Sequence, residues 1–216
     1  MKAGALAPYE CALRQAAALS LVSNDGRVLP LAILRYLDDA DDVDYTVFDQ
    51  CVAPVLDVGC GPGRIVHALA AAGLPALGID IADTAVALTV QRGAPALIRS
   101  VFERVPGEGR WPTVLVLDGN IGIGGDVAEL LDRLAALMAA GGSLIIEAST
   151  VDVATDEVLD VRFSVENQAL GPHFRWAVVG AQALIGYAGP AGLAVADYWS
   201  ARGREFLRFE RNTLAP

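Results

Sequence analysis

The stretch from Val55 to Arg64 constrains the fold of this chain more than any other part of it. A short apolar run leads into glycines at three alternate positions, Gly59, Gly61 and Gly63, and an alanine-rich segment with helical spacing follows at once. Glycine allows a sharp turn and lets a ligand approach the backbone, and a following helix presents open N–H groups at the positive end of its dipole. The sequence therefore predicts a strand, a tight turn and a helix that together bind a small ligand.

The spacing of these glycines separates two classes of cofactor. Dinucleotide-binding turns carry G-x-G-x-x-G, and from Gly59 that pattern would place its third glycine where Arg64 stands. Asp57 precedes the first glycine by two residues, and a carboxylate there suits a cationic amino-acid group better than a pyrophosphate. The order Asp-x-Gly-x-Gly-x-Gly resembles the first motif of the class I S-adenosylmethionine (SAM)-dependent methyltransferases.

The resemblance implies S-adenosylmethionine as the cofactor and a set of residues around it. Asp57 would face its amino-acid end, and Asp80, at the tip of the predicted strand Ala76–Asp80, would accept hydrogen bonds from the ribose hydroxyls. Residues 100–102 would meet the adenine, although the acid that many relatives have there is absent. The full set implied for the cofactor is Asp57, Gly59, Cys60, Gly61, Gly63, Asp80, Ile81, Ser100, Val101, Phe102, Asp118, Gly119 and Asn120.

Alternating strand and helix patterns predict an α/β fold with a doubly wound, mainly parallel sheet. The strands are continuous apolar runs, as expected when both faces of a sheet are covered. By resemblance, a closing hairpin completes a Rossmann-like sheet of seven strands in the order 3-2-1-4-5-7-6. The helix that is usual in the family after the third strand is expected to be absent or very short, because residues 106–109 read as a loop. The predicted strands are 55–58, 76–80, 96–99, 113–118, 143–149, 194–200 and 205–211, and the helices are 63–72, 82–92 and 126–140.

We expect residues 1–216 to form a single methyltransferase domain. Residues 1–50 are expected to be an N-terminal helical cap, 51–149 the SAM-binding core, and 150–216 the acceptor-side insertion and closing hairpin. Within the cap, the acidic segment 38–49 is expected to be a solvated linker. The resemblance also implies a lid that would draw on Arg35, Tyr36 and Tyr45.

Few residues are candidates for a catalytic group. Methyl transfer requires alignment of the nucleophile with the methyl carbon, and a general base is needed only if the acceptor must lose a proton. The candidates are Glu147, at the end of the fifth predicted strand, and His173, between inserted strands at 161–166 and 174–179. No residues have metal-ligand spacing, so no metal is expected.

Charge and hydropathy argue against two kinds of binding partner, nucleic acids and membranes. The formal net charge is −10 and the chain has no basic run, which argues against nucleic acid. The longest apolar stretch, Ala177–Ala196, is interrupted by glycines, Gln182 and Pro190, so no membrane partner is expected. The first twenty residues do not read as a signal peptide, which predicts a cytoplasmic protein. The sequence does not set the oligomeric state.

The sequence thus predicts a SAM-dependent methyltransferase that acts on a small-molecule acceptor, at oxygen, nitrogen or carbon. One alternative is an NAD-dependent oxidoreductase on a related sheet, because such folds also place an acid about 20 residues after the turn. The other is a non-catalytic SAM-binding partner or sensor protein, because the adenine-binding acid and an obvious base are missing.

Overall fold

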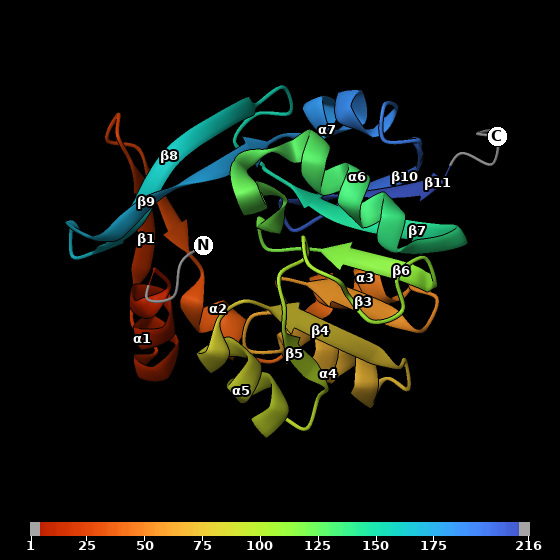
Figure 1. Ribbon diagram of the computed structural model, residues 1–216, viewed down its shortest axis with the longest axis horizontal. Coiled ribbons are helices and arrows are strands. Elements are labelled where there is room, and N and C mark those ends of the chain that lie inside the picture. The colour runs from red at the N-terminus through yellow and green to blue at the C-terminus, as the bar shows by residue number, and fades with distance from the viewer. Residues whose placement is uncertain (1–4, 212–216) are drawn as a thin grey trace.

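A seven-stranded sheet forms the centre of the computed structural model, which describes residues 5–211 (Figure 1). The hairpin strand β11 pairs antiparallel with the last of five parallel strands. The strand order β5-β4-β3-β6-β7-β11-β10 is the predicted order 3-2-1-4-5-7-6, so the predicted fold class is confirmed. The strands are β3 (Val55–Val58), β4 (Ala76–Asp80), β5 (Ala96–Ile98), β6 (Trp111–Val116), β7 (Met138–Ala148), β10 (Leu193–Ala201) and β11 (Arg204–Arg211).

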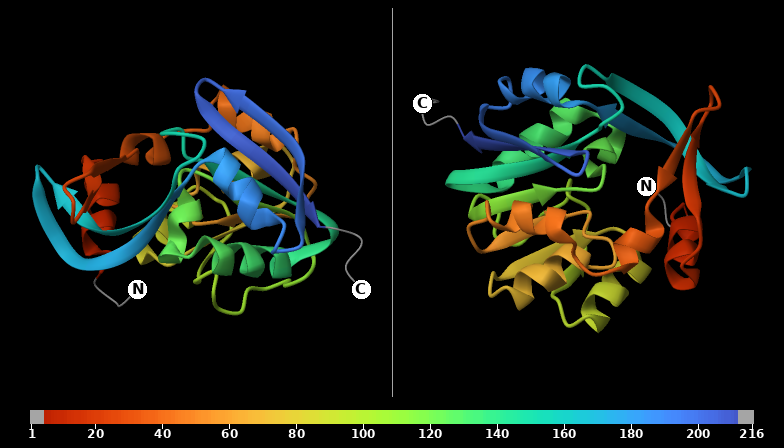
Figure 2. Two further views of the ribbon diagram at one scale, coloured as in Figure 1. Left: turned by 90° about the horizontal axis from the view of Figure 1, so that it is seen from above. Right: turned by 180° about the vertical axis from the view of Figure 1, so that it is seen from behind.

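Helices cover both faces of this sheet because its central strands are apolar on both sides. On one face, Val55 and Leu115 share a core with Ile65 of α4 (Arg64–Ala71), and α5 (Asp83–Gln91) lies beside α4. On the other face, Val114 shares a core with Leu130 of α6 (Val127–Leu137), which lies next to α7 (Ala181–Ala188). Figure 1 views the sheet from the α6 side, and the right panel of Figure 2 views it from behind.

The segment between β5 and β6 contains no helix, as predicted. Val101 and Val105 are buried there and fill the space beside α6 that a helix would otherwise cover. Arg133 of α6 holds the segment in place by donating hydrogen bonds to the backbone oxygens of Val101 (2.7 Å) and Glu103 (2.6 Å). The segment is therefore packed although it has no regular structure.

A second, antiparallel sheet stands at one end of the molecule and joins two distant parts of the chain (Figures 1 and 2). Its order is β2-β1-β8-β9. β8 and β9 are the inserted strand pair, but they turn at Glu166 and Asn167, so residues 168–173, expected between the two strands, belong to β9. The N-terminal segment contains the expected helices and, in addition, the unpredicted hairpin β1–β2. The elements are α1 (Ala7–Gln15), β1 (Leu19–Ser23), β2 (Val28–Leu31), α2 (Ile33–Leu37), β8 (Asp156–Val165) and β9 (Gln168–Val179).

The acidic segment 38–49 is not the solvated linker that was expected. Most of it forms α3 (Asp42–Phe48), and Asp41 caps this helix by accepting hydrogen bonds from the N–H groups of Val43 (2.9 Å) and Asp44 (3.0 Å). The Asp44 side chain accepts a hydrogen bond from the Asp41 N–H in return (2.9 Å), which completes a capping box. The run of acids was thus a helix start with one buried acid. Among the described helices, none combines the length and the apolar composition needed to cross a bilayer.

Candidate active site

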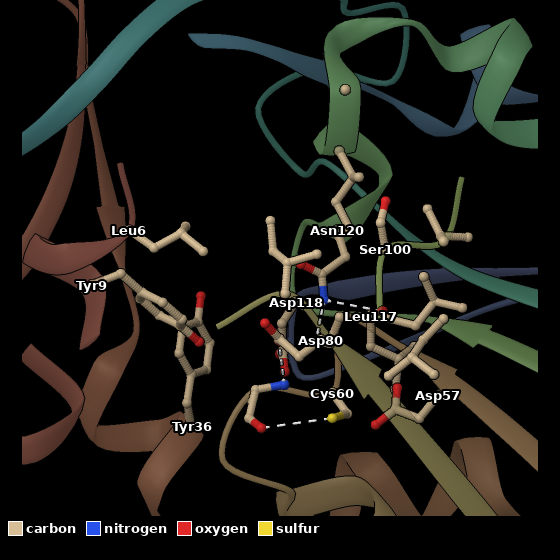
Figure 3. A pocket seen from close by; sticks show the side chains of 18 of the residues that line it. Leu6, Tyr9, Tyr36, Asp57, Cys60, Asp80, Ser100, Leu117, Asp118 and Asn120 are labelled. Atoms are coloured by element: carbon tan, nitrogen blue, oxygen red, sulfur yellow. Dashed lines mark hydrogen bonds between the residues drawn. The ribbon is translucent and has the colours of Figure 1, made fainter. Parts of the chain in front are cut away.

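A cavity of about 450 Å³ lies at the carboxyl ends of β3, β4 and β6, between the two sheets (Figure 3). Its lining combines the glycine turn, the strand-end acids Asp57, Asp80 and Asp118, and side chains from the second sheet. All residues predicted for the cofactor line it except Gly63 and Gly119. The structure therefore brings almost the whole predicted set together at one place.

The glycine turn has a backbone that only glycine suits. Gly59, Gly61 and Gly63 have φ values of 74°, 53° and 85°. A Cβ on Gly59 would lie 2.6 Å from the Asn120 amide, and a Cβ on Gly63 would lie 2.5 Å from the Thr89 methyl group. Gly63 therefore supports the turn from behind rather than facing the cavity.

Two side chains hold the turn in this shape. Asn120 donates a hydrogen bond through Nδ2 to the Gly59 carbonyl (2.9 Å), and the Thr89 hydroxyl donates one to the Gly61 carbonyl (2.9 Å). Cys60 is buried, and its sulfur packs where a Cβ on Gly78 of β4 would stand. Burial raises the pKa of this thiol above its usual value, so Cys60 is neutral at physiological pH.

Asp57 lies beneath the turn and is only 3% exposed. Its Oδ2 atom has no hydrogen-bond partner within residues 5–211. Burial, followed by the charges of Asp118 and Asp80, raises the pKa of Asp57 to about 8. A buried carboxylate oxygen without a partner is unfavourable, so a cationic or hydrogen-bond-donating ligand at this point would stabilise the site.

Asp80 ends β4 and faces the cavity. Its carboxylate accepts hydrogen bonds from the N–H groups of Gly61 (2.9 Å) and Ala82 (2.8 Å), which fix its orientation. Burial raises the pKa of Asp80, and the two N–H groups oppose that rise. Each oxygen of an ionised carboxylate has a second lone pair, so Asp80 retains the capacity to accept hydrogen bonds from a ligand.

The predicted adenine region presents mainly apolar surface. Phe102 and Ile81 line the cavity and are each 39% exposed, and the Phe102 ring lies about 3.0 Å from where a Cβ on Gly124 would stand. Ser100 Oγ accepts a hydrogen bond from the Phe102 N–H (3.3 Å), which orders this segment. Two exposed hydrophobic side chains at a cavity wall offer faces against which a flat ring can pack.

A buried ion cluster borders the cavity, and sequence reasoning missed it. The cluster consists of Arg35, Arg64, Arg204, Asp44, Asp118 and Glu147. Arg64 stands where a dinucleotide-binding turn would have its third glycine. Its side chain is 2% exposed and ion-paired with Asp44, and its Nη2 atom lies 2.7 Å from Asp118 Oδ2. Arg204 Nη1 lies 2.8 Å from Asp44 Oδ1. Arg204, the first residue of β11, turns toward these acids rather than toward solvent.

Glu147 belongs to this cluster and is not a lining residue of the cavity. Its two oxygens accept bidentate hydrogen bonds from Arg204 (2.7 Å each), and Oε2 also accepts one from the Asp118 N–H (2.7 Å). His173 lies within β9, is exposed, and has its Nδ1 3.5 Å from Asp160 Oδ2. It does not line the cavity either, and no histidine or lysine does among the residues that the structure describes.

Two tyrosines from the N-terminal segment cover the cavity. Figure 3 shows Tyr9 and Tyr36 facing the strand-end acids, and a Cβ on Gly61 would lie 3.3 Å from the Tyr9 hydroxyl. Burial raises the pKa of Tyr9 well above its usual value and that of Tyr36 to about 12, with nearby aspartates adding to both shifts. Of the residues expected in a lid, Tyr36 lines the cavity, Arg35 joins the ion cluster, and Tyr45 packs on Phe48 outside it.

Four aromatic rings, three of them from the second sheet, line the cavity, and the sequence did not reveal them. We call Tyr9, Phe163, Phe174 and Trp176 the aromatic wall. Successive ring centroids lie 6.5, 5.3 and 6.3 Å apart. The period-two spacing of Phe174 and Trp176 was a usable signal, because it places both rings on one face of a strand.

No protein-family model and no curated protein sequence matches the chain. Solved structures do match. A SAM-dependent methyltransferase from Bacteroides fragilis, in complex with S-adenosyl-L-homocysteine, aligns with a TM-score of 0.74 at 21% identity over 95% of this chain and 92% of that one. An amino pentose methyltransferase from Micromonospora echinaspora, bound to SAM, gives 0.61 at 20% identity over 83% and 95%.

A magnesium protoporphyrin IX methyltransferase from Synechocystis, also bound to SAM, gives a TM-score of 0.57 at 20% identity over 82% of this chain and 88% of that one. These identities are low, but the likeness extends over most of each chain. It agrees with the strand order and with the position of the glycine turn. The chain therefore has the fold of the class I SAM-dependent methyltransferases.

Proposed function

We propose that this protein binds S-adenosylmethionine and transfers its methyl group to a small-molecule acceptor. Residues 51–149 hold the cofactor, and residues 1–50 and 150–216 cover it and shape the acceptor site within a single domain. One observation carries the proposal: Asp57 Oδ2 is buried beside the glycine turn without a partner. A ligand with an ammonium and a sulfonium group supplies the missing positive charge, whereas a pyrophosphate would add negative charge next to three aspartates.

The residues around the turn divide the work of binding. Asp57 faces the amino-acid end of the cofactor, and Asp80 accepts hydrogen bonds from the ribose hydroxyls. Phe102 and Ile81 pack against the adenine ring, with Ser100 and Val101 at its edge. Gly59 and Gly61 let the cofactor approach the backbone, and Asn120 keeps Gly59 in place through the hydrogen bond to its carbonyl.

Cys60, Asp118 and the flanking glycines complete the cofactor site. Cys60 fits into the turn because Gly78 leaves room for its sulfur. Asp118 is oriented by Arg64 and by the Glu147 carboxylate, which accepts a hydrogen bond from its N–H. Gly63 and Gly119 support the turn and the loop without lining the cavity. In this proposal Glu147 is a positioning residue, and His173 has no role in catalysis because it lies outside the cavity lining.

In this proposal, the reaction depends on positioning the acceptor and not on a general base. SAM supplies an activated methyl group on a sulfonium when bound. The chain aligns the acceptor with that methyl group and excludes water by closing Tyr9 and Tyr36 over the site. Both tyrosines keep their protons at neutral pH, since their pKa values are raised. A neutral hydroxyl donates a hydrogen bond and removes no proton, so an acceptor that reacts without a histidine or lysine base suits this site.

The acceptor is proposed as a small molecule on two grounds. Solved structures of similar fold include a 1,6-didemethyltoxoflavin N1-methyltransferase and a magnesium protoporphyrin IX methyltransferase. The formal net charge of −10 disfavours a nucleic-acid acceptor. The proposal therefore expects a metabolite in the cavity rather than a polymer across the surface.

Calorimetry with SAM and S-adenosylhomocysteine tests the proposal. We expect Asp57→Ala and Asp80→Ala each to weaken SAM binding by about tenfold or more, which is about 1.4 kcal/mol. Asp132→Ala, a change of an exposed acid on α6, is the matched control and should leave the affinity unchanged. Unaltered affinity in both site variants would show that the cofactor site is assigned wrongly.

The two alternatives have separate tests. NAD should neither bind nor raise the melting temperature, because a ligand stabilises a protein only if it binds the folded state. A protein that stabilises with NAD and not with SAM would be the oxidoreductase. Transfer of labelled methyl from SAM to any acceptor by the pure protein would exclude a purely non-catalytic SAM-binding role.

A further inference from the structure

The part of the cavity that the second sheet lines has a composition unlike the rest. The aromatic wall forms one side of it, and Leu21 and Leu31 of the second sheet adjoin that wall. Phe163 and Leu21 are 5% and 2% exposed, so this surface is fixed by the core of the second sheet. Rings held in this way present preformed apolar faces to a ligand.

Charged groups are scarce on this side. Tyr9 supplies a hydroxyl, and the lining residues that β1, β2, β8 and β9 contribute include no aspartate, glutamate, lysine or histidine. Their one charged member is Arg175, which is exposed and whose Cβ lies 2.5 Å from where a Cβ on Gly125 would stand. A cationic acceptor would find no carboxylate here, and the many hydroxyls of a sugar would lose water without gaining partners.

The loop after β6 fixes the depth of this space. Its 3₁₀ segment η1 (Asn120–Gly125) has glycines where two aromatic rings rest on it. A Cβ on Gly122 would overlap the Trp176 indole, and a Cβ on Gly124 would lie 3.0 Å from Phe102. One loop therefore contacts Trp176 of β9 and Phe102 of the segment between β5 and β6, next to Asn120 and the glycine turn.

We propose that the methyl acceptor is a flat aromatic molecule without positive charge, held against the aromatic wall with its nucleophilic atom toward the glycine turn. This inference rests on the proposed function. Aromatic rings favour offset and edge-to-face contacts with other rings, and Phe163, Phe174 and Trp176 offer both faces and edges. Tyr9 connects the aromatic wall with the glycine turn, since its ring stacks on Phe163 while its hydroxyl lies over Gly61.

The transfer step balances without a further reactant. The acceptor atom forms a bond to the methyl carbon while the bond between that carbon and the sulfonium sulfur breaks, and the bonding pair stays on sulfur. A hydroxyl acceptor releases its proton to bulk water when the methylated product leaves the site. The neutral Tyr9 hydroxyl is placed to donate a hydrogen bond near this point and does not take the proton.

The test compares a flat neutral probe with a puckered neutral probe and with a flat cationic probe. Protein saturated with S-adenosylhomocysteine is titrated with 2-naphthol, with decahydro-2-naphthol, which has the same carbon skeleton but no flat rings, and with 2-naphthylmethylamine, which carries a positive charge. We expect 2-naphthol to bind about tenfold more tightly than either of the other two probes. Equal or tighter binding of decahydro-2-naphthol or of the amine overturns the inference, and so does no binding of 2-naphthol.

Two variants test whether the aromatic wall causes the preference for 2-naphthol. Phe174→Leu keeps an apolar side chain but removes a half-buried ring of the wall, and we expect it to reduce the preference for 2-naphthol over decahydro-2-naphthol to about twofold. Tyr198→Leu removes an exposed ring on β10, outside the cavity, and should keep the full preference. A full preference in Phe174→Leu overturns the inference.

The affinity for S-adenosylhomocysteine separates the two levels of the proposal. If S-adenosylhomocysteine does not bind, the proposed function fails and the inference falls with it. If it binds normally and 2-naphthol does not, the aromatic acceptor alone is wrong and the cofactor assignment stands.

Discussion

Arg64, the first residue of the helix after the glycine turn, is ion-paired with Asp44 of α3, and the two side chains are 2% and 0% exposed. Neither charge faces water, so each depends on the partners that surround it. Arg64 also meets Asp118 at 2.7 Å, and Asp44 also meets Arg204 at 2.8 Å. The pair thus ties the N-terminal segment to the helix after the glycine turn and to the closing hairpin.

The first prediction concerns the removal of one charge from this pair. Asp44→Asn should lower the free energy of unfolding by about 3 kcal/mol, because it removes one of the two carboxylates that pair with the buried Arg64 guanidinium. Asp42→Asn on the same helix is the control, because Asp42 pairs with Arg202 while both are exposed. That change should stay within about 0.5 kcal/mol. Urea unfolding measures both, and similar losses would mean that burial of the cluster does not govern its energetics.

The second prediction concerns pH and Asp57. Its pKa in the ligand-free folded protein is about 8, above its ordinary value, so folding favours the protonated form. The free energy of unfolding should therefore fall as pH rises from about 4 to about 8, because the unfolded chain ionises this group freely over that range. Below about pH 4 the group is protonated in both states and has no such effect.

Asp57→Asn should remove this dependence. The ligand-free variant should be more stable than the wild type at about pH 8, by about 1 kcal/mol or more, even if only a quarter of the shift is expressed. The difference should shrink toward about pH 4. Thermal unfolding across this pH range measures it, with Asp132→Asn as the control. A constant difference between variant and wild type would show that Asp57 ionises normally.

The third prediction compares two glycines with left-handed backbones. Gly63 has φ of 85° and its Cβ position is 2.5 Å from the Thr89 methyl group, whereas Gly73 has φ of 78° and nothing within 4 Å. Alanine at either position should lose about 1 kcal/mol for the backbone strain alone. Gly63→Ala should lose a further 1 kcal/mol or more, roughly, because Thr89 must move. It should also weaken SAM binding, and losses of equal size would show that Thr89 adapts freely.

The fourth prediction separates the acceptor from the cofactor. Gly122→Ala places a methyl group against the Trp176 indole, so the aromatic wall must shift. Methyl transfer to an aromatic hydroxyl acceptor should fall by about tenfold or more, while S-adenosylhomocysteine affinity should stay within about twofold. Trp176→Leu should act in the same direction, and Gly186→Ala, which has open space around it, should not change either quantity. A parallel loss of cofactor binding in both site variants would contradict this separation.

The alternating pattern of residues 55–149 and the glycine turn predicted the main sheet well. Each strand and helix there is specified by its own apolar residues and by a glycine or polar stop close by in sequence. The same locality explains why Asp57 and Asp80 were placed correctly at strand ends, since parallel strands present all their carboxyl ends at one edge. Whether these acids hold the cofactor stays a prediction.

The missed features depend on partners far away in sequence. The five aspartates of residues 38–44 were predicted to be solvated, yet Asp44 is buried because Arg64 and Arg204 pair with it. Arg204 lies over the Phe206 ring at 5.0 Å and pairs with Glu147 of β7, and no pattern within β11 indicates that second contact. β1 is short and gains its stability from pairing with β8, so no local pattern marks it strongly.

The pairing of β1 with β8 also sets an order of events during synthesis. Ser20 lies opposite Ser164 in that sheet, so β1 cannot pair with β8 until most of the chain has been synthesised. A nascent chain that has reached β6 already contains the whole glycine turn, together with Asp57 and Asp80, but none of β8 or β9. The part of the molecule with the glycine turn is thus encoded early, whereas the aromatic wall is complete only after residues 156–179 have joined the N-terminal segment.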